Sequence, residues 1–236
     1  MSSSLVKNTV IIVAETPIMN PSEIIPYQNL SVKYSVFLNT LLFLNWIEIL
    51  SEDKEHFSII ALLNEKDKEY LPKYFLPQDA ATIFYHESHL PEISEYLFKQ
   101  TVAIDSKTII LFFNSIGFKL NDISRALNLI QTDEPSIVIG KSSRDQIVFT
   151  CALGVDKELI DPIFLTKRKN AEYLNAISSK DIFIHTLDGF LSINDFEDIK
   201  KLYIELSKKE SLSYCSPKMH ESFNDLFIEY KDLLDV

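Results

Sequence analysis

The sequence predicts an α/β protein with three layers, in which helices cover both faces of a mostly parallel, mixed sheet. Short β-branched apolar runs such as Asn8–Ala14 alternate with segments of helical periodicity over residues 1–130. Strands that are apolar throughout are typical of a sheet buried on both faces. Two later strands, Ser136–Gly140 and Gln146–Leu153, are joined by the short polar connection Lys141–Asp145, so a hairpin is expected to add an antiparallel member.

Strands are expected where a short run of β-branched or aromatic residues is bounded by polar turn residues. By this criterion the strands are Asn8–Ala14, Phe57–Leu63, Thr82–Tyr85, Thr108–Phe113, Ser136–Gly140, Gln146–Leu153 and Asp181–Leu187.

Helices are expected where apolar residues recur at helical spacing behind a polar cap or an early proline. These segments are Leu30–Ile49, Asp67–Phe75, Pro91–Ala103, a helix capped by Asn121 or Asp122 that runs to Gln131, Asn170–Ile177, Asn194–Ser207 and Pro217–Leu234. In one of them, Asn194 and Glu197 have the spacing of a capping box.

Length and charge limit the classes of protein that the chain can form. The 236 residues, 46% of them hydrophobic, can bury one full core. We expect a single α/β domain over residues 1–210, with residues 211–236 as a C-terminal helical extension packed on it. A net charge of -11 argues against a nucleic acid partner, because lysine and arginine dominate phosphate binding. The basic run Lys167–Lys169 is predicted to be a solvated loop or helix start.

A cytoplasmic location without a membrane partner is expected. Cys151 and Cys215 have neither the number nor the spacing of a disulfide framework or a zinc site. The N-terminal apolar run Val10–Ala14 is too short for a signal sequence. No stretch is expected to approach the roughly 20 apolar residues that a spanning helix needs.

The carboxyl ends of parallel strands are where such sheets bind ligands. Asn114 and Ser115 follow the strand Thr108–Phe113, and this end has no carboxylate, no lysine and no glycine-rich loop. The sequence therefore predicts the fold of an enzyme with much of the chemistry of its site removed.

Four segments resemble motifs of one known family and occur in the same order along the chain. They are residues 13–26, 109–120, 137–149 and 190–199. They resemble motifs of bacterial glycosyltransferase-like proteins related to phospholactate guanylyltransferase. That family has the GT-A, or nucleotide-diphospho-sugar transferase, fold. The resemblance implies this fold here, and it implies a nucleotide or sugar as the ligand class.

The first segment resembles the family's nucleotide-binding loop, F-A-K-x-P-x-P-G-x-x-K-T-R-L. The positions that correspond to this loop are Ala14, Glu15, Thr16, Pro17, Asn20 and Glu23. The alanine and the first proline are kept, whereas the two family lysines fall on Glu15 and Glu23. The resemblance implies that those lysines would hold the phosphates, so carboxylates in their place would repel an anionic ligand.

The other segments place an ancestral cleft and show what it has lost. Its residues are expected to be Asn114, Ser115, Lys141, Ser142, Ser143, Arg144, Asp145, Ser192 and Asn194. The aspartates of the family motifs V-V-L-I-G-x-D and L-x-D-V-D fall on Ser115, Ser192 and Asn194. Magnesium and manganese prefer carboxylate oxygens, so no metal site and no cofactor are expected.

Two hypotheses of function follow. The first is a diverged transferase-like protein without metal-dependent activity, which acts by binding a ligand or a protein partner. The alternative is an active glycosyl- or nucleotidyltransferase that works without metal or with relocated groups. The candidate relocated groups are Lys119, Lys141, Arg144, Asp188 and Asp195. Mg²⁺ or Mn²⁺ is implied only by this alternative.

The chain is expected to be a monomer or a homodimer. The aromatic helix Pro217–Leu234 either mediates dimerisation or closes the back of the sheet.

Overall fold

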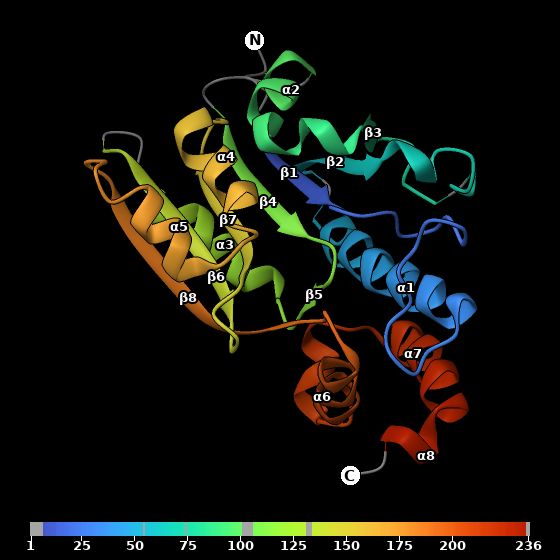
Figure 1. Ribbon diagram of the computed structural model, residues 1–236. Helices are drawn as coiled ribbons and strands as arrows, with labels where there is room; N and C mark the ends of the chain where they lie inside the picture. Colours follow the sequence, from blue (N-terminus) through green and yellow to red (C-terminus); the bar gives the residue numbers. More distant parts are fainter. Residues whose placement is uncertain (1–6, 54, 74, 101–105, 131–133, 235–236) are drawn as a thin grey trace.

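The computed structural model describes residues 7–53, 55–73, 75–100, 106–130 and 134–234. Over these residues the chain forms an eight-stranded sheet in the order β3-β2-β1-β4-β7-β6-β8-β5 (Figure 1). The strands are β1 Asn8–Val13, β2 Phe57–Asn64, β3 Ala81–Tyr85, β4 Lys107–Phe112, β5 Ser115–Ile116, β6 Ser136–Ser142, β7 Ile147–Leu153 and β8 Phe183–Ser192. All the strands expected from the sequence are present, and β5 is an additional two-residue strand.

The sheet is mixed in the expected way. Strand β1 pairs in parallel with β2 and β4, β2 pairs in parallel with β3, and β6 pairs in parallel with β8. Strand β7 is antiparallel to both β4 and β6. The predicted hairpin is therefore confirmed, and it inserts β7 between the parallel strands on either side.

Helices cover both faces, which confirms the three layers. The helices are α1 Val32–Ser51, α2 Ile93–Gln100, α3 Leu120–Leu129, α4 Lys157–Leu165, α5 Asn170–Ala176, α6 Phe196–Leu206, α7 Pro217–Glu229 and α8 Lys231–Leu234, with 3-10 turns η1 Glu65–Asp67, η2 Glu87–Glu92 and η3 Lys209–Ser213. One apolar core joins the sheet to α1, α3, α6 and α7, and a second joins it to α2, α4 and α5. Alternate residues of β1 enter the two cores, as the strand period of two requires.

Two of the expected helices are wrong or incomplete. The described residues of Asp67–Phe75 form no helix beyond Asp67, the last residue of the turn η1. The carboxylate of Asp67 instead accepts hydrogen bonds from the loop after β1. The segment Pro91–Ala103 becomes a 3-10 turn followed by α2 up to Gln100, and residues 101–103 lie outside the described part of the chain. Helix α4 was not predicted, since Pro162 lies inside it.

Two caps also differ from the expectation. Asp122 lies within the first turn of α3 and accepts from the backbone N–H of Lys119, so neither it nor Asn121 is the cap residue. The cap of α6 is Asp195, which accepts from the N–H of Asp198 at 3.0 Å. The expected box of Asn194 and Glu197 is therefore shifted by one residue.

Helix α1 corrects the expectation that no stretch approaches the length of a membrane span. Among the described residues, Val32–Ser51 alone is long and apolar enough by composition, and 61% of the tested window is buried inside the protein. Its apolar side chains belong to the core beneath the sheet. That burial is what a core helix requires.

Helix α7 packs on α1, and α8 packs on α6 and α7 (Figure 1). The ring of Tyr230 meets that of Tyr34 edge-on at 5.2 Å, and its hydroxyl accepts from the N–H of Ser31. Phe223 and Leu226 of α7 are fully buried in the same core as α1. Dimerisation through this region stays a prediction.

Gly140 is required by the packing of a neighbouring ring. A Cβ atom at Gly140 would lie 2.0 Å from the ring of Phe149, which contacts the rings of Phe118 and Phe190. We expect Gly140→Ala to lower the free energy of unfolding by about 1–3 kcal/mol through overpacking. Urea denaturation measures the loss, and the double variant with Phe149→Leu should lose less than the sum of the two single changes. Strict additivity would contradict the contact.

Candidate functional site

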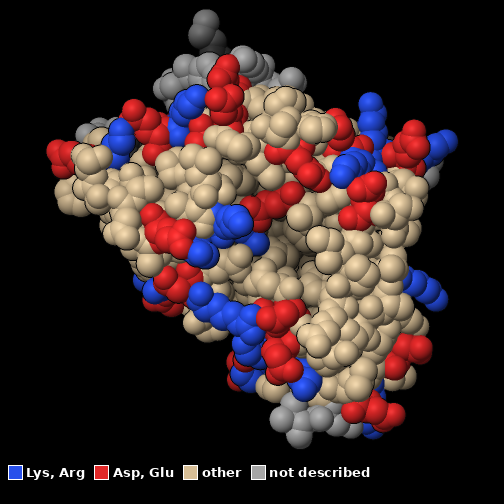
Figure 2. Space-filling view, viewed as in Figure 1, with Lys and Arg blue, Asp and Glu red and all other residues tan. Residues whose placement is uncertain are grey.

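A cleft opens at the carboxyl end of β1 and β4, where the sheet was expected to bind ligands. The cavity holds about 560 Å³ and is bounded by the loop after β1, the residues after β4 and the residues after β8. Figure 2 shows a hollow in the middle of this face with charged side chains around it. Of the predicted loop residues, Glu15, Thr16, Pro17 and Glu23 line the cavity, whereas Ala14 and Asn20 are buried beside it.

A buried ion pair lies in the wall of the cleft. The Nε of Arg168 is 2.7 Å from a carboxylate oxygen of Glu15, and Arg168 is 5% exposed. Its Nη1 donates to Oδ1 of Asn114 at 3.0 Å, and its guanidinium lies 4.4 Å from the ring centroid of Phe112. The expectation of a solvated Lys167–Lys169 run is therefore wrong for its central residue.

The backbone explains why Arg168 turns inward. Lys167 and Arg168 both have positive φ, 51° and 61°, in the tight turn between α4 and α5. The N–H of Arg168 donates to Ile163, and its carbonyl accepts from Ile147 at 2.7 Å, which fixes the turn against β7. Burial lowers the pKa of Arg168, and the carboxylate of Glu15 opposes that change. A guanidinium stays protonated in such a site, so the pair is ionic.

Neutral groups occupy the positions of the family's aspartates. Nδ2 of Asn114 donates to Oδ1 of Asn194 at 3.0 Å, and Nδ2 of Asn194 donates to Oε1 of Gln146 at 2.8 Å. Ser192 also donates to that oxygen at 2.8 Å. Ser115 is 1% exposed and lies opposite Ser192 in the β5–β8 pair. The sequence therefore placed Asn114, Ser115, Ser192 and Asn194 together correctly.

Gln146 is the residue of this network that sequence reasoning missed. It directly follows the β6–β7 turn, and its backbone forms an isolated bridge to Lys169. Its side-chain oxygen accepts hydrogen bonds from Ser192, the last residue of β8, and from Asn194 just after it. The local sequence pattern does not predict a role for Gln146, because its hydrogen-bond partners lie more than 40 residues away in the sequence.

The donor set does not fit a magnesium or manganese ion. Within the described ranges of the chain, no group of three or more histidine, cysteine, aspartate or glutamate residues is placed to hold a metal. The nearest carboxylates, Asp195 and Asp198, are paired with Arg144, and Asp198 is 1% exposed. Amide and hydroxyl oxygens bring no charge to offset the dehydration of a small divalent cation.

The loop after β1 is held by an internal anion. Backbone N–H groups of Ile18, Met19 and Asn20 all donate to the carboxylate of Asp67 at 2.8–2.9 Å, and Asp67 is fully buried. Successive N–H groups that converge in this way form a nest of the kind that binds phosphate. In this loop Asp67 already fills the nest, and no pattern in the sequence singles Asp67 out.

The two acidic replacements in this loop have cationic partners. Glu15 pairs with Arg168, and Glu23 lies 2.9 Å from Nζ of Lys66. The negative electrostatic potential that the sequence predicts for this loop is therefore partly offset, because a cation pairs with each of the two carboxylates. Glu87 and Asp195 also line the cleft, so acidic groups still outnumber basic ones around it.

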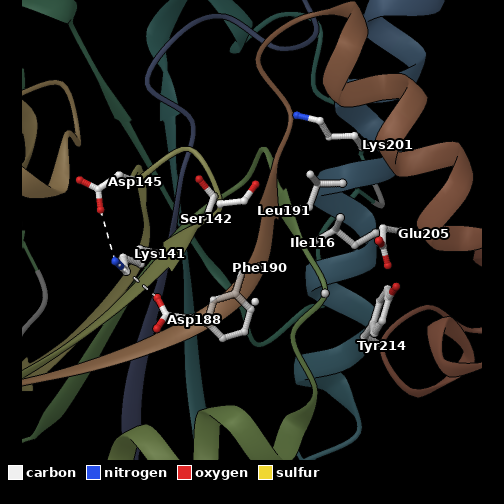
Figure 3. A pocket seen from close by; sticks show the side chains of 13 residues that line it. Ile116, Lys141, Ser142, Asp145, Asp188, Phe190, Leu191, Lys201, Glu205 and Tyr214 are labelled. Carbon is white, nitrogen blue, oxygen red and sulfur yellow. Dashed lines mark hydrogen bonds and ion pairs between the residues drawn. The ribbon is translucent and has the colours of Figure 1, made fainter.

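Four other residues of the expected cleft lie in a second cavity, whereas Ser115, Arg144 and Ser192 line neither space. Lys141, Ser142, Ser143 and Asp145 line a space of about 540 Å³ between the β6–β7 turn, the end of β8 and α6, and no residue lines both cavities. Figure 3 shows Lys141 between Asp145 and Asp188 on the wall of this space. The ancestral cleft predicted as one site is thus divided in two.

The candidate relocated groups do not converge. Lys141 and Asp188 line the second cavity, whereas Asp195 lines the cleft. Arg144 joins the β6–β7 turn to the N-terminus of α6 through Asp195 and Asp198 and lines neither space. Lys119 precedes α3 and also lines neither. This set therefore supplies no single site for a phosphate or a metal.

The comparisons with known proteins support the fold. One similar structure is a protein of Desulfovibrio desulfuricans G20 that is described as a nucleotide-diphospho-sugar transferase by inference. It superposes with a TM-score of 0.64 at 12% sequence identity, and the match covers 97% of this chain and 96% of that chain. The Anaerococcus prevotii 4-diphosphocytidyl-2C-methyl-D-erythritol synthase has a TM-score of 0.49 at 15% identity, covering 86% and 99%.

A third structure is a CMP:2-keto-3-deoxy-manno-octonic acid synthetase with CTP, at a TM-score of 0.48, 8% identity and coverage of 85% and 98%. No family model and no curated protein matches the sequence. The chain has the nucleotide-diphospho-sugar transferase fold.

The Asp67 carboxylate should carry much of the stability of the loop. We expect Asp67→Asn to lower the free energy of unfolding by about 2–4 kcal/mol. Two carboxylate oxygens accept from three buried N–H groups, and asparagine replaces one of these oxygens with an NH₂ donor. Urea denaturation measures the change. Asp79→Asn, at an exposed residue, is the matched control and should stay within about 0.5 kcal/mol of wild type. Equal effects of the two changes would contradict the anchoring role.

The ion pair of Arg144 should be visible as a pH dependence. The hydrogen bond from Arg144 lowers the pKa of Asp195, so the pair's stabilisation is present above the unfolded pKa of Asp195 and is lost as pH falls through the lower folded value. Arg144→Ala should raise that pKa toward its ordinary range, as NMR titration of the carboxyl can measure. Because both side chains are more than a third exposed, the stability effect should be below about 1 kcal/mol.

Lys209→Ala, at an exposed lysine of η3, is the control for this titration. It should leave the Asp195 pKa unchanged. An unchanged pKa in Arg144→Ala as well would show that the ion pair does not form in solution.

Proposed function

We propose that this chain is a diverged protein of the nucleotide-diphospho-sugar transferase fold that binds a ligand in its cleft without a divalent metal and does not carry out metal-dependent transfer. We also propose that its ancestry lies with the glycosyltransferase-like proteins related to phospholactate guanylyltransferase. The motif order supports that relation, since each altered position falls at the cleft or beside it.

The amide network carries this proposal. Asn114 donates to Asn194, and Asn194 donates to Gln146. Arg168 donates to the side-chain oxygen of Asn114. A cation entering this position would have to break these bonds and would gain only neutral oxygens. The network therefore favours a cleft wall that is complete without a metal.

The same cleft is poorly suited to a phosphate. Nε and Nη1 of Arg168 are already bonded to Glu15 and Asn114, and the N–H groups of the loop are bonded to Asp67. Glu15, Glu23, Glu87 and Asp195 line the cavity, and Arg168 is the one basic residue among the described residues of the lining. Lys66 and Arg144 pair with the other three carboxylates from outside the lining. We propose a neutral or cationic ligand, held by the amides and by the apolar side chains that share the lining, such as Ile24 and Phe113.

A second candidate is a transferase that works without a metal. Arg168 is the observation that favours it, because a buried guanidinium in the cleft wall can stabilise developing negative charge without a divalent ion. In this case Glu15 would have to release the guanidinium when the substrate binds. Binding of nucleotides in the absence of metal would support this candidate over the first.

Isothermal titration calorimetry tests the proposal through the charge of the ligand and the need for metal. Wild-type protein is titrated with GTP, CTP, UTP and UDP-sugars, each with and without Mn²⁺, and with the corresponding neutral nucleosides. We expect no manganese-dependent binding tighter than about tens of micromolar. We also expect the triphosphates to bind no more tightly than their nucleosides, because the cleft lacks a free cation for them.

A variant that restores the lost acids is the matched control. Ser192→Asp with Asn194→Asp returns carboxylates to two family positions, and Mn²⁺ binding should rise above that of wild type, provided that thermal unfolding shows a folded protein. Tight, manganese-dependent nucleotide binding by the wild type would overturn the proposal. Tight nucleotide binding without metal would replace it by the metal-independent candidate.

A further inference from the structure

The second cavity has features of a ligand site in its own right. It holds about 540 Å³, which is within the size range of small-molecule pockets. Its walls come from elements far apart in the sequence: β5, the β6–β7 turn, the end of β8, α6 and the residue after η3. No residue that the structure describes lines both this cavity and the cleft.

The charged groups of this cavity are mixed in sign. Nζ of Lys141 lies 3.4 Å from Asp145 and 3.6 Å from Asp188, so the ammonium is shared between two carboxylates (Figure 3). Lys201 and Glu205 face the space from α6. Three carboxylates and two ammonium groups therefore line it, which disfavours a phosphate or any other polyanion.

Hydroxyl groups and open backbone complete the wall. The Oγ of Ser142 has no hydrogen-bond partner although Ser142 is 6% exposed. Gly189 has a φ of +100°, and a Cβ built on it would meet nothing within 4 Å, so the backbone here borders open space. Burial, with Glu205 nearby, raises the pKa of Tyr214 to about 12, so its hydroxyl keeps its proton.

We propose that this cavity binds an uncharged, polyhydroxylated ligand of the sugar or cyclic polyol class. Carboxylates only accept hydrogen bonds and ammonium groups only donate them, and a ligand hydroxyl can satisfy either. Asp188 accepts from the ligand, Lys141 donates to it, and Ser142 gains the partner that it lacks. The apolar side chains of Ile116, Phe190 and Leu191 pack against the C–H face of the ring.

NMR titration of the full chain tests the proposal with D-glucose, D-galactose, myo-inositol and inorganic phosphate as probes. At least one of the three polyols should cause saturable shifts of amides in residues 140–145 and 188–191, with a Kd of about 1 mM or tighter. Inorganic phosphate should bind more weakly than that polyol. Shifts centred on Asn114 and Asn194 instead would place the ligand in the cleft and overturn the proposal.

Three variants locate the site. Asp188→Asn should weaken binding about tenfold, because a charged acceptor is lost, and Asp188 is 70% exposed, so the fold should not suffer. Ser142→Ala should weaken binding severalfold without lowering the free energy of unfolding, because its hydroxyl has no partner to lose. Asp181→Asn, at an exposed residue before the other end of β8, is the control and should leave the affinity unchanged.

The outcomes decide the proposal. Saturable binding that is weakened by Asp188→Asn and not by Asp181→Asn supports it. No saturable binding of any of the three polyols, equal effects of the two aspartate changes, or tighter binding of phosphate would each overturn it.

Discussion

The ion pair between Arg168 and Glu15 is the interaction on which the site depends. The guanidinium of Arg168, in the turn between α4 and α5, bonds to Glu15 in the loop after β1 and to Asn114 in the loop after β4. It also lies over the ring of Phe112. Removing one partner of a buried pair leaves an uncompensated charge, whereas the intact pair is about neutral in free energy. The pair therefore fixes the geometry of the cleft more than it stabilises the fold. Because its guanidinium is already paired with a carboxylate, it is less available to the phosphates of a nucleotide.

A consequence of this arrangement is that the space above the sheet is divided. The amides of Asn114, Asn194 and Gln146 bridge from β4 to β8, and Arg144 fixes the β6–β7 turn to α6. The cleft lies on one side of this bridge and the cavity around Lys141 lies on the other. In a protein with carboxylates at these positions, mutual repulsion would disfavour such a closed network unless a cation lay between them. Neutral residues remove that requirement.

The sequence predicted the sheet well, because its strands are apolar runs whose burial is encoded locally. The residues after β4 and β8 were also placed together correctly, since the order of the motifs carried that long-range information. The burial of Arg168 could not be predicted, because its neighbours Lys167 and Lys169 suggest a solvated turn and its partners lie in other elements. Asp67 was assigned to a helix for the same reason, as its role is set by a loop nearly 50 residues away. The register of the β6–β7 turn against β8 decides which cavity Lys141 faces, and no local pattern specifies it.

The most direct measurement is crystallographic. A crystal soaked in a UDP-sugar and Mn²⁺, with data collected at the manganese absorption edge, would show whether a cation enters the cleft. The account predicts no anomalous peak beside Asn114, Ser192 and Asn194, and an Arg168 side chain still paired with Glu15. An ordered manganese ion there, bridging a bound diphosphate, would contradict it.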